Sequence, residues 1–246
     1  MAAHPHHGET DSFELDAGLW AKVRNIILFC FLISATATAA GYFLDAKQFF
    51  HSYLAAFMWG TRILLGALFF LMAGYLAGAA WNVTFRRFSE TMAMTIPYGL
   101  ILFIPVALGI HELYHWSHPE AVAHDKVLQG KAAWLNTNFF ILRAGIYFAV
   151  WTFFAWGIYR NSTAMDQDKD IRHMHSSSRF AAPGMLLVFL ATSFAAFDWL
   201  MSLDPHWFST MYGIYIYAGG GLASMCALVL ISLAFRRAGV LKNSIT

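Results

Sequence analysis

Charged residues are scarce in this sequence of 246 residues. Asp, Glu, Lys and Arg make up 12% of it, whereas ordinary soluble domains contain roughly 25%. Hydrophobic residues make up 59%, and they form continuous runs rather than the alternating pattern of a membrane β-strand. The formal net charge of +2 is too small to suggest a nucleic-acid partner. The composition therefore predicts an all-α integral membrane protein.

Cysteine is also nearly absent. The two cysteines, Cys30 and Cys226, both fall inside apolar runs. They cannot form a Cys-x-x-Cys pair, a c-type haem attachment site or the ligand set of an iron–sulfur cluster. No histidine lies deep inside an apolar run, which disfavours a haem b held by two histidines. We therefore expect this chain to hold no metal and no redox centre, and other chains to carry any electrons.

Six apolar runs approach the ~20 residues that a helix needs to cross a ~30 Å hydrocarbon core. The runs are residues 26–44, 54–81, 94–113, 138–159, 181–203 and 211–235. Residues 1–25 form a polar tail that lacks the residue order of a cleavable signal peptide. Residues 26–159 are predicted to hold helices one to four, residues 160–180 a charged loop, residues 181–235 helices five and six, and residues 236–246 a tail.

Basic residues predict the orientation of the six-helix bundle. Eleven Lys and Arg residues lie in the two tails and in the connections after the second and fourth runs, whereas three lie in the remaining connections. Cytoplasmic segments carry the excess of Lys and Arg. Both termini and the 160–180 loop are therefore predicted to be cytoplasmic.

Four ionisable residues interrupt the apolar runs, on the half of the membrane away from the cytoplasm. They are Arg62, Glu112, Arg143 and Asp198. A carboxylate at membrane depth costs roughly 2.5–3.5 kcal/mol, so it normally faces a bundle interior or a hydrated cavity. These residues predict either a proton path or quinone-headgroup pocket, or ion pairs that fix helix packing, with Arg143 snorkelling to the interface. Which acid pairs with which arginine stays open.

Other polar residues near Asp198 and Glu112 complete the set of candidates. His111, His115, Ser202 and His206 are predicted to lie on the same side of the membrane. The segment His111-Glu112-Leu113-Tyr114-His115 matches the H-E-x-x-H pattern of zinc proteases, in which both imidazoles share a helix face. The pattern stands at the end of a run and no third ligand motif follows it. We interpret it as an interfacial polar cluster, and an intramembrane zinc protease remains the less favoured alternative.

Three segments together resemble one family. They are His111–Trp116 with His118, residues 131–143 (KAAWLNTNFFILR), and residues 177–213, of which the run Asp198–Trp207 (DWLMSLDPHW) is the most specific. The chain resembles the polysulfide reductase membrane-subunit (NrfD-like) family, and within it the second large membrane subunit of alternative complex III, the bacterial quinol:cytochrome c oxidoreductase. The resemblance covers about residues 20–235.

The resemblance implies a subunit of a respiratory complex in the bacterial inner membrane. It implies as partners a paired NrfD-like membrane subunit, an iron–sulfur subunit and multihaem cytochrome c subunits, which would hold the iron–sulfur clusters and haem c. This chain would scaffold the complex, without redox centres of its own, and would conduct protons near Asp198 or line a quinone site. Family members have about ten helices, so the chain resembles the N-terminal part of a longer fold. The alternative from another class is a stand-alone proton or ion transporter, although we find no inverted repeat.

Overall fold

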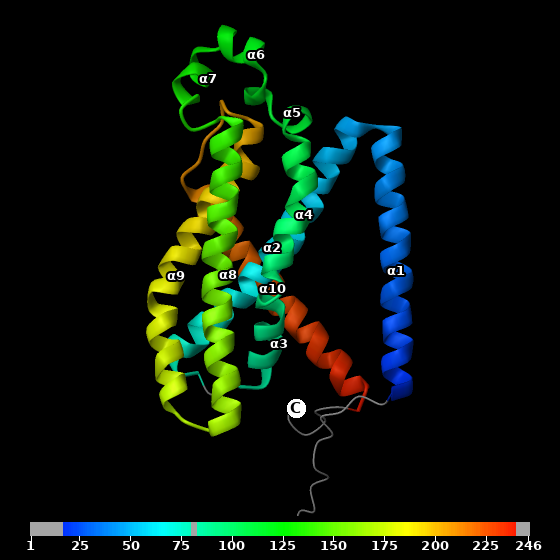
Figure 1. Ribbon diagram of the computed structural model, residues 1–246, viewed down its shortest axis with the longest axis vertical. Helices are drawn as coiled ribbons and strands as arrows, with labels where there is room; N and C mark the ends of the chain where they lie inside the picture. Colours follow the sequence, from blue (N-terminus) through cyan, green and yellow to red (C-terminus); the bar gives the residue numbers. More distant parts are fainter. Residues whose placement is uncertain (1–16, 80–82, 240–246) are drawn as a thin grey trace, which may run out of the picture.

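The computed structural model describes residues 17–79 and 83–239, and within these ranges it contains helices and no strand. Five long helices are single rods: α1 Ala17–Leu44, α2 Ala46–Ala77, α8 Thr137–Asp168, α9 Arg172–Trp199 and α10 Met211–Arg237 (Figure 1). The third apolar span along the chain comprises α3 Val83–Ala93 and α4 Ile96–Leu108. Six helices in the described residues are thus long and apolar enough to cross a membrane, which confirms the predicted all-α class.

The third span begins earlier than hydropathy predicts. It runs from Phe85 to Leu108 rather than from residue 94 to residue 113. Helix α3 carries Arg86, Arg87 and Glu90, so a hydropathy window assigns it to a loop. These charges can lie inside the helical span because they pair with one another, as described below.

The predicted loop at residues 160–180 is wrong for most of its length. Helix α8 continues to Asp168 and α9 begins at Arg172, which leaves a three-residue turn. Lys169 closes α8 with a left-handed backbone (φ 56°), and its N–H bonds to the Met165 carbonyl. Polar residues stop an apolar run without stopping a helix, so both helices extend past the apolar segments.

The bundle has two distinct ends. The basic end is the end at which α1 begins, the α8–α9 turn lies and α10 ends at Arg237 (Figure 1). The loop end is the opposite end, where the short helices α5 Ile110–Leu113, α6 Pro119–His124 and α7 Lys126–Lys131 lie. The chain starts and finishes its described residues at the same end, as an even number of crossings requires.

An aromatic core joins α2, α4, α8 and α9. Trp199 is completely buried, and its ring centroid lies 4.8 Å from that of Phe103, 5.7 Å from Phe57 and 5.9 Å from Phe148. A tryptophan at the end of an apolar run suggests an aromatic belt at the membrane surface. Trp199 instead packs inside the bundle because α9 ends there and its last turn faces α8.

Two glycines let α2 and α10 cross with their backbones in contact. A Cβ added at Gly66 would lie 2.1 Å from the carbonyl oxygen of Gly220, and one at Gly220 would lie 2.7 Å from the Arg62 carbonyl oxygen. Close backbone approach at small residues is a usual way to pack helices within a membrane. This crossing fixes α10 against the first half of the bundle.

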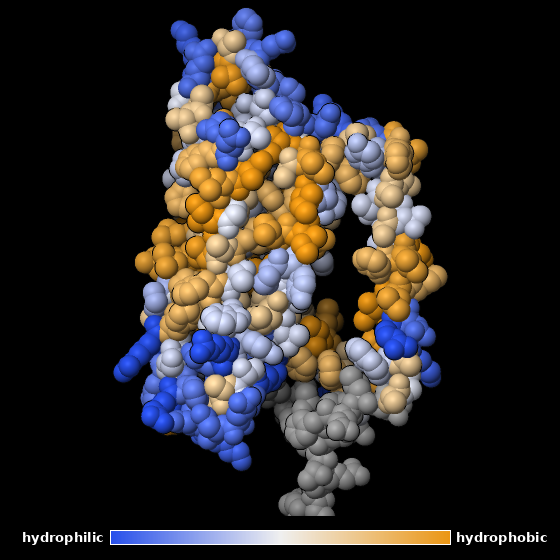
Figure 2. All heavy atoms as spheres, in the orientation of Figure 1, coloured by the Kyte–Doolittle hydropathy of each residue, from blue (hydrophilic) through white to orange (hydrophobic). Residues whose placement is uncertain are grey.

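Helix α1 stands apart from the rest of the bundle. None of its residues is buried. It connects to α2 at the loop end, and Figure 2 shows an opening between α1 and the other helices. In the isolated chain, both faces of α1 are therefore available to lipid or to another protein.

Candidate functional site

Asp198 and Arg143 form an ion pair inside the bundle. The Arg143 Nε atom lies 2.6 Å from Asp198 Oδ2, and Nη2 donates to Oδ1 at 2.9 Å. Asp198 comes from the last turn of α9 and is 1% exposed, whereas Arg143 comes from the second turn of α8 and is 4% exposed. This two-point geometry is the strongest form of arginine–carboxylate contact. The pairing that the sequence left open is thus with Arg143 rather than Arg62.

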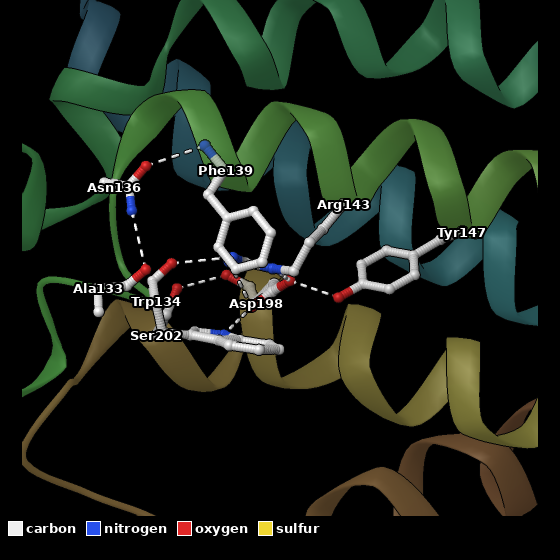
Figure 3. A network of polar contacts seen from close by, with 8 residues as sticks. All are labelled: Ala133, Trp134, Asn136, Phe139, Arg143, Tyr147, Asp198 and Ser202. Atoms are coloured by element: carbon white, nitrogen blue, oxygen red, sulfur yellow. Dashed lines mark hydrogen bonds and ion pairs between the residues drawn. The ribbon is translucent and has the colours of Figure 1, made fainter.

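Two further donors saturate the carboxylate of Asp198. The Tyr147 hydroxyl donates to Oδ2 at 2.6 Å, and the Trp134 indole N–H donates to Oδ1 at 2.8 Å. Figure 3 shows these side chains converging on Asp198 from α8 and from the segment that precedes it. Each carboxylate oxygen therefore accepts two hydrogen bonds. Such a complete set of donors is what makes a buried charge tolerable.

The Arg143 guanidinium lies between two aromatic rings. Its central carbon is 4.2 Å from the Trp134 ring centroid and 4.3 Å from the Phe139 ring centroid. Its Nη1 atom also donates to the Trp134 carbonyl at 2.9 Å. Arginine stacks on aromatic faces with favourable cation–π energy, which grows when water is excluded. Arg143 therefore points into the bundle and does not snorkel to the membrane surface.

Local caps hold the site in place. The Asn136 side chain accepts from the Phe139 N–H at 2.9 Å and so starts α8 one turn before Phe139. The Ser202 hydroxyl donates to the Asp198 carbonyl at the end of α9. Tyr114 donates to the Trp199 carbonyl at 2.9 Å, and burial, reinforced by the Asp198 charge, raises the pKa of Tyr114, so that its hydroxyl keeps its proton. The loop-end segments thereby fix the backbone around Asp198.

A cavity of about 270 Å³ adjoins the network at the loop end. Its lining includes Trp134, Phe197, Asp198, Ser202 and Trp207. The Asp198 carboxylate is already bonded and almost fully buried, and the Lys131 ammonium, also in the lining, donates to the Pro205 carbonyl at 2.5 Å. The cavity therefore offers aromatic and aliphatic walls rather than free charges, which suits an apolar ring or chain.

Arg62 lies apart from this network. It sits on α2 at the crossing with α10, and no carboxylate of the described residues forms an ion pair with it. Its buried Nε atom has no hydrogen-bond partner. The structure thus brings Asp198, Arg143 and Ser202 together and leaves Arg62 separate.

The remaining candidates lie on the exposed surface of the loop end. Helix α5 ends at Leu113 and Tyr114 is extended, so His115 falls in the short helix η2 His115–Ser117. His111 and His115 therefore do not share one helix face, as the zinc-protease pattern requires. Glu112, His111 and His115 are exposed. His206 binds Asp125 through Nε2 at 2.7 Å and links the segment before α10 to the start of α7.

A second buried polar cluster, which the sequence did not reveal, lies toward the basic end. We call it the Glu90 cluster and define it as Tyr75, Arg87, Glu90, Ser162 and Ser177, from α2, α3, α8 and α9. Glu90 is 1% exposed, and its Oε2 atom lies 2.6 Å from Arg87 Nη1. Arg87 also donates to the Ser162 hydroxyl at 3.2 Å and pairs with Asp166.

Several polar atoms of the Glu90 cluster have no hydrogen-bond partner. They are Glu90 Oε1 and the hydroxyls of Tyr75 and Ser177. Arg86 Nε lies 3.6 Å from Glu90 Oε1, which is an ion pair but too long for a hydrogen bond. The sequence signal for this cluster is that Arg86 and Arg87 stand four and three residues before Glu90, in a segment with no proline before Pro97.

No protein-family model and no curated protein sequence matches this chain. The fold and the buried ion pair define its class: an all-helical, multi-pass integral membrane protein with charged residues paired inside the bundle.

Proposed function

We propose that this chain is an integral membrane subunit of a bacterial respiratory quinol:cytochrome c oxidoreductase, in which it scaffolds the complex. One observation carries the proposal. The three segments that resemble the NrfD-like family are separate in the sequence, and they meet at one place. Tyr114 bonds to Trp199, and Trp134 and Arg143 bond to Asp198. The resemblance thus falls on one three-dimensional site rather than on scattered apolar residues.

A scaffolding role is supported by how the Asp198 site is built. Its carboxylate is saturated by four donor groups, two of them on Arg143 of α8, so the network stabilises the α8–α9 contact. The exposed α1 helix supports the same role, because an unburied spanning helix suits contact with a neighbouring membrane subunit. In this proposal, iron–sulfur and multihaem cytochrome c subunits carry the electrons, and the paired NrfD-like subunit is the better candidate for oxidising quinol.

Two features favour more specific roles for this chain. The aromatic cavity beside Asp198 suits the ring or tail of a quinone near the loop end. The Glu90 cluster favours proton transfer as a second candidate function, because a buried carboxylate oxygen and two hydroxyls there lack partners. The Glu90 cluster would suit a proton-conducting subunit of a complex and a stand-alone proton transporter equally well. The presence or absence of partner subunits distinguishes the two.

Purification of the full chain from its native membranes in a gentle detergent tests the proposal. We expect mass spectrometry and a haem-stained gel to find an iron–sulfur subunit and multihaem cytochromes with it. If the chain is isolated without partner subunits and conducts protons in vesicles, the proposal is wrong and the chain is a stand-alone proton transporter. In the assembled complex, Asp198→Asn and the exposed control Asp204→Asn should be compared for subunit content and quinol oxidation. We expect Asp198→Asn to weaken assembly and Asp204→Asn to leave it unchanged.

A further inference from the structure

A groove at the basic end separates the start of α1 from the end of α10. Its volume is about 630 Å³. One wall is formed by Trp20 and Val23 of α1, and the facing wall by Ala234, Phe235 and Arg237 of α10. None of the described residues that line it is acidic. The groove therefore combines apolar walls with a cation.

The charge around the groove has one sign among the described residues. Arg236 and Arg237 occupy the last turn of α10, and Lys22 and Arg24 lie in the first two turns of α1. Of these four, Arg237 is among the described residues that line the groove, and the other three are its neighbours along the two helices. All four side chains are exposed, and none forms an ion pair with a described residue. Basic residues at the end of a helix also complement its dipole, but that role alone needs no groove and no facing helix.

We propose that this groove binds an anionic phospholipid. Basic pockets between spanning helices at the basic side of membrane proteins bind anionic headgroups, and the guanidinium fork matches a phosphate in two-point geometry. Trp20 is half exposed in the first turn of α1, and tryptophan near the end of a spanning helix favours the region between headgroup and acyl chain. The acyl chains lie in the opening between α1 and the bundle that Figure 2 shows. The lipid thereby fills the space beside α1 that side chains leave open.

The test titrates the purified full chain with phosphatidylglycerol and with phosphatidylcholine of identical acyl chains, and counts bound lipid by native mass spectrometry. The wild type should prefer phosphatidylglycerol. The double variant Arg236→Gln/Arg237→Gln should lose roughly 30-fold in phosphatidylglycerol affinity, since each basic group near an anionic surface contributes about fivefold. The matched control Arg160→Gln/Arg179→Gln removes two exposed charges from α8 and α9 at the same end and should keep the preference.

A second variant tests the groove itself without changing its charge. Val23→Trp places a bulky side chain in the groove, and it should reduce lipid binding while the arginines remain. Equal losses of phosphatidylglycerol affinity in the two double variants would show that the lipid is attracted to surface charge in general, and would overturn the proposed site. A wild type without headgroup preference, or a Val23→Trp chain that binds as the wild type does, would overturn it as well. These measurements use the isolated chain, so they are independent of whether it belongs to a respiratory complex.

Discussion

Removing both members of the Asp198–Arg143 pair together should cost less stability than the sum of the costs of removing each one alone. Asp198→Leu leaves the Arg143 guanidinium buried with two fewer acceptors. It also leaves the Tyr147 hydroxyl and the Trp134 indole N–H without the acceptor that they share. Breaking a buried pair by removing one partner typically costs about 3–5 kcal/mol. Both side chains are at most 5% exposed, so water gives little compensation. We therefore expect Asp198→Leu and Arg143→Met each to lower the free energy of unfolding by about 3–5 kcal/mol.

The double variant Asp198→Leu/Arg143→Met replaces the pair with apolar side chains. Such replacements are often neutral or stabilising in other proteins, so the double variant should lose less than the two single variants together. The coupling energy is measured by a double-mutant cycle, with reversible unfolding in mixed micelles and tryptophan fluorescence as the signal. We expect a coupling of at least about 2 kcal/mol. If the losses of unfolding free energy in the two single variants add up to that of the double variant, the structural role of the pair is refuted. A loss below about 1 kcal/mol in each single variant would refute it as well.

Three other perturbations test separate parts of the fold. Tyr147→Phe removes one hydrogen bond to a carboxylate and should lower the unfolding free energy by about 1.5–3 kcal/mol, whereas Tyr217→Phe removes a weak 3.6 Å contact to sulfur and should cost less. Gly66→Ala forces a Cβ onto the α10 backbone and should cost about 1–3 kcal/mol or more, whereas Gly145→Ala, with open space around it, should be nearly neutral in the same unfolding assay. The third concerns Asp125: despite desolvation, hydrogen bonds from the Val127 and Leu128 N–H groups and from His206 lower its pKa. Because the pKa of the Asp125 carboxyl is lowered, its negative charge stabilises the folded state above the unfolded value of about 3.9, so hydrogen-exchange protection of residues 119–131 should fall as the pH drops below about 4. Asp125→Asn should abolish this fall, and a fall that persists in Asp125→Asn would point to another group.

The number of spans was predictable because membrane crossing is a one-dimensional property of sequence. An apolar run of about 20 residues predicts a helix whatever its neighbours are. The same reasoning identified Asp198, since a carboxylate in such a run must be compensated. It could not choose between Arg62 and Arg143, because the choice depends on which faces of α2 and α8 turn toward α9. Snorkelling and inward pairing of Arg143 are equally compatible with its position in the sequence.

The Glu90 cluster was missed for a related physical reason. Hydropathy counts each charge as a cost, whether or not a partner of opposite sign lies one helical turn away. Arg87 and Glu90 on α3 satisfy each other locally, and Ser162 of α8 joins the cluster from another helix, on which Asp166 also pairs with Arg87. The spacing of Arg86, Arg87 and Glu90 could have suggested a helix. The contribution of α8 required the tertiary fold.

The two buried carboxylates differ in what they can do with a proton. Each oxygen of Asp198 accepts two hydrogen bonds, so a proton could be added only if one of the donors left. The added proton would also leave the Arg143 guanidinium without its counter-charge. Glu90 keeps one oxygen without a hydrogen bond and has unpaired hydroxyls beside it. If the chain conducts protons, Glu90→Gln should therefore reduce flux while the fold persists, whereas Asp198→Asn should reduce flux only through loss of stability. Flux and unfolding free energy, measured on both variants in vesicles, separate these outcomes. A stable Asp198→Asn chain without proton flux would contradict the division of roles.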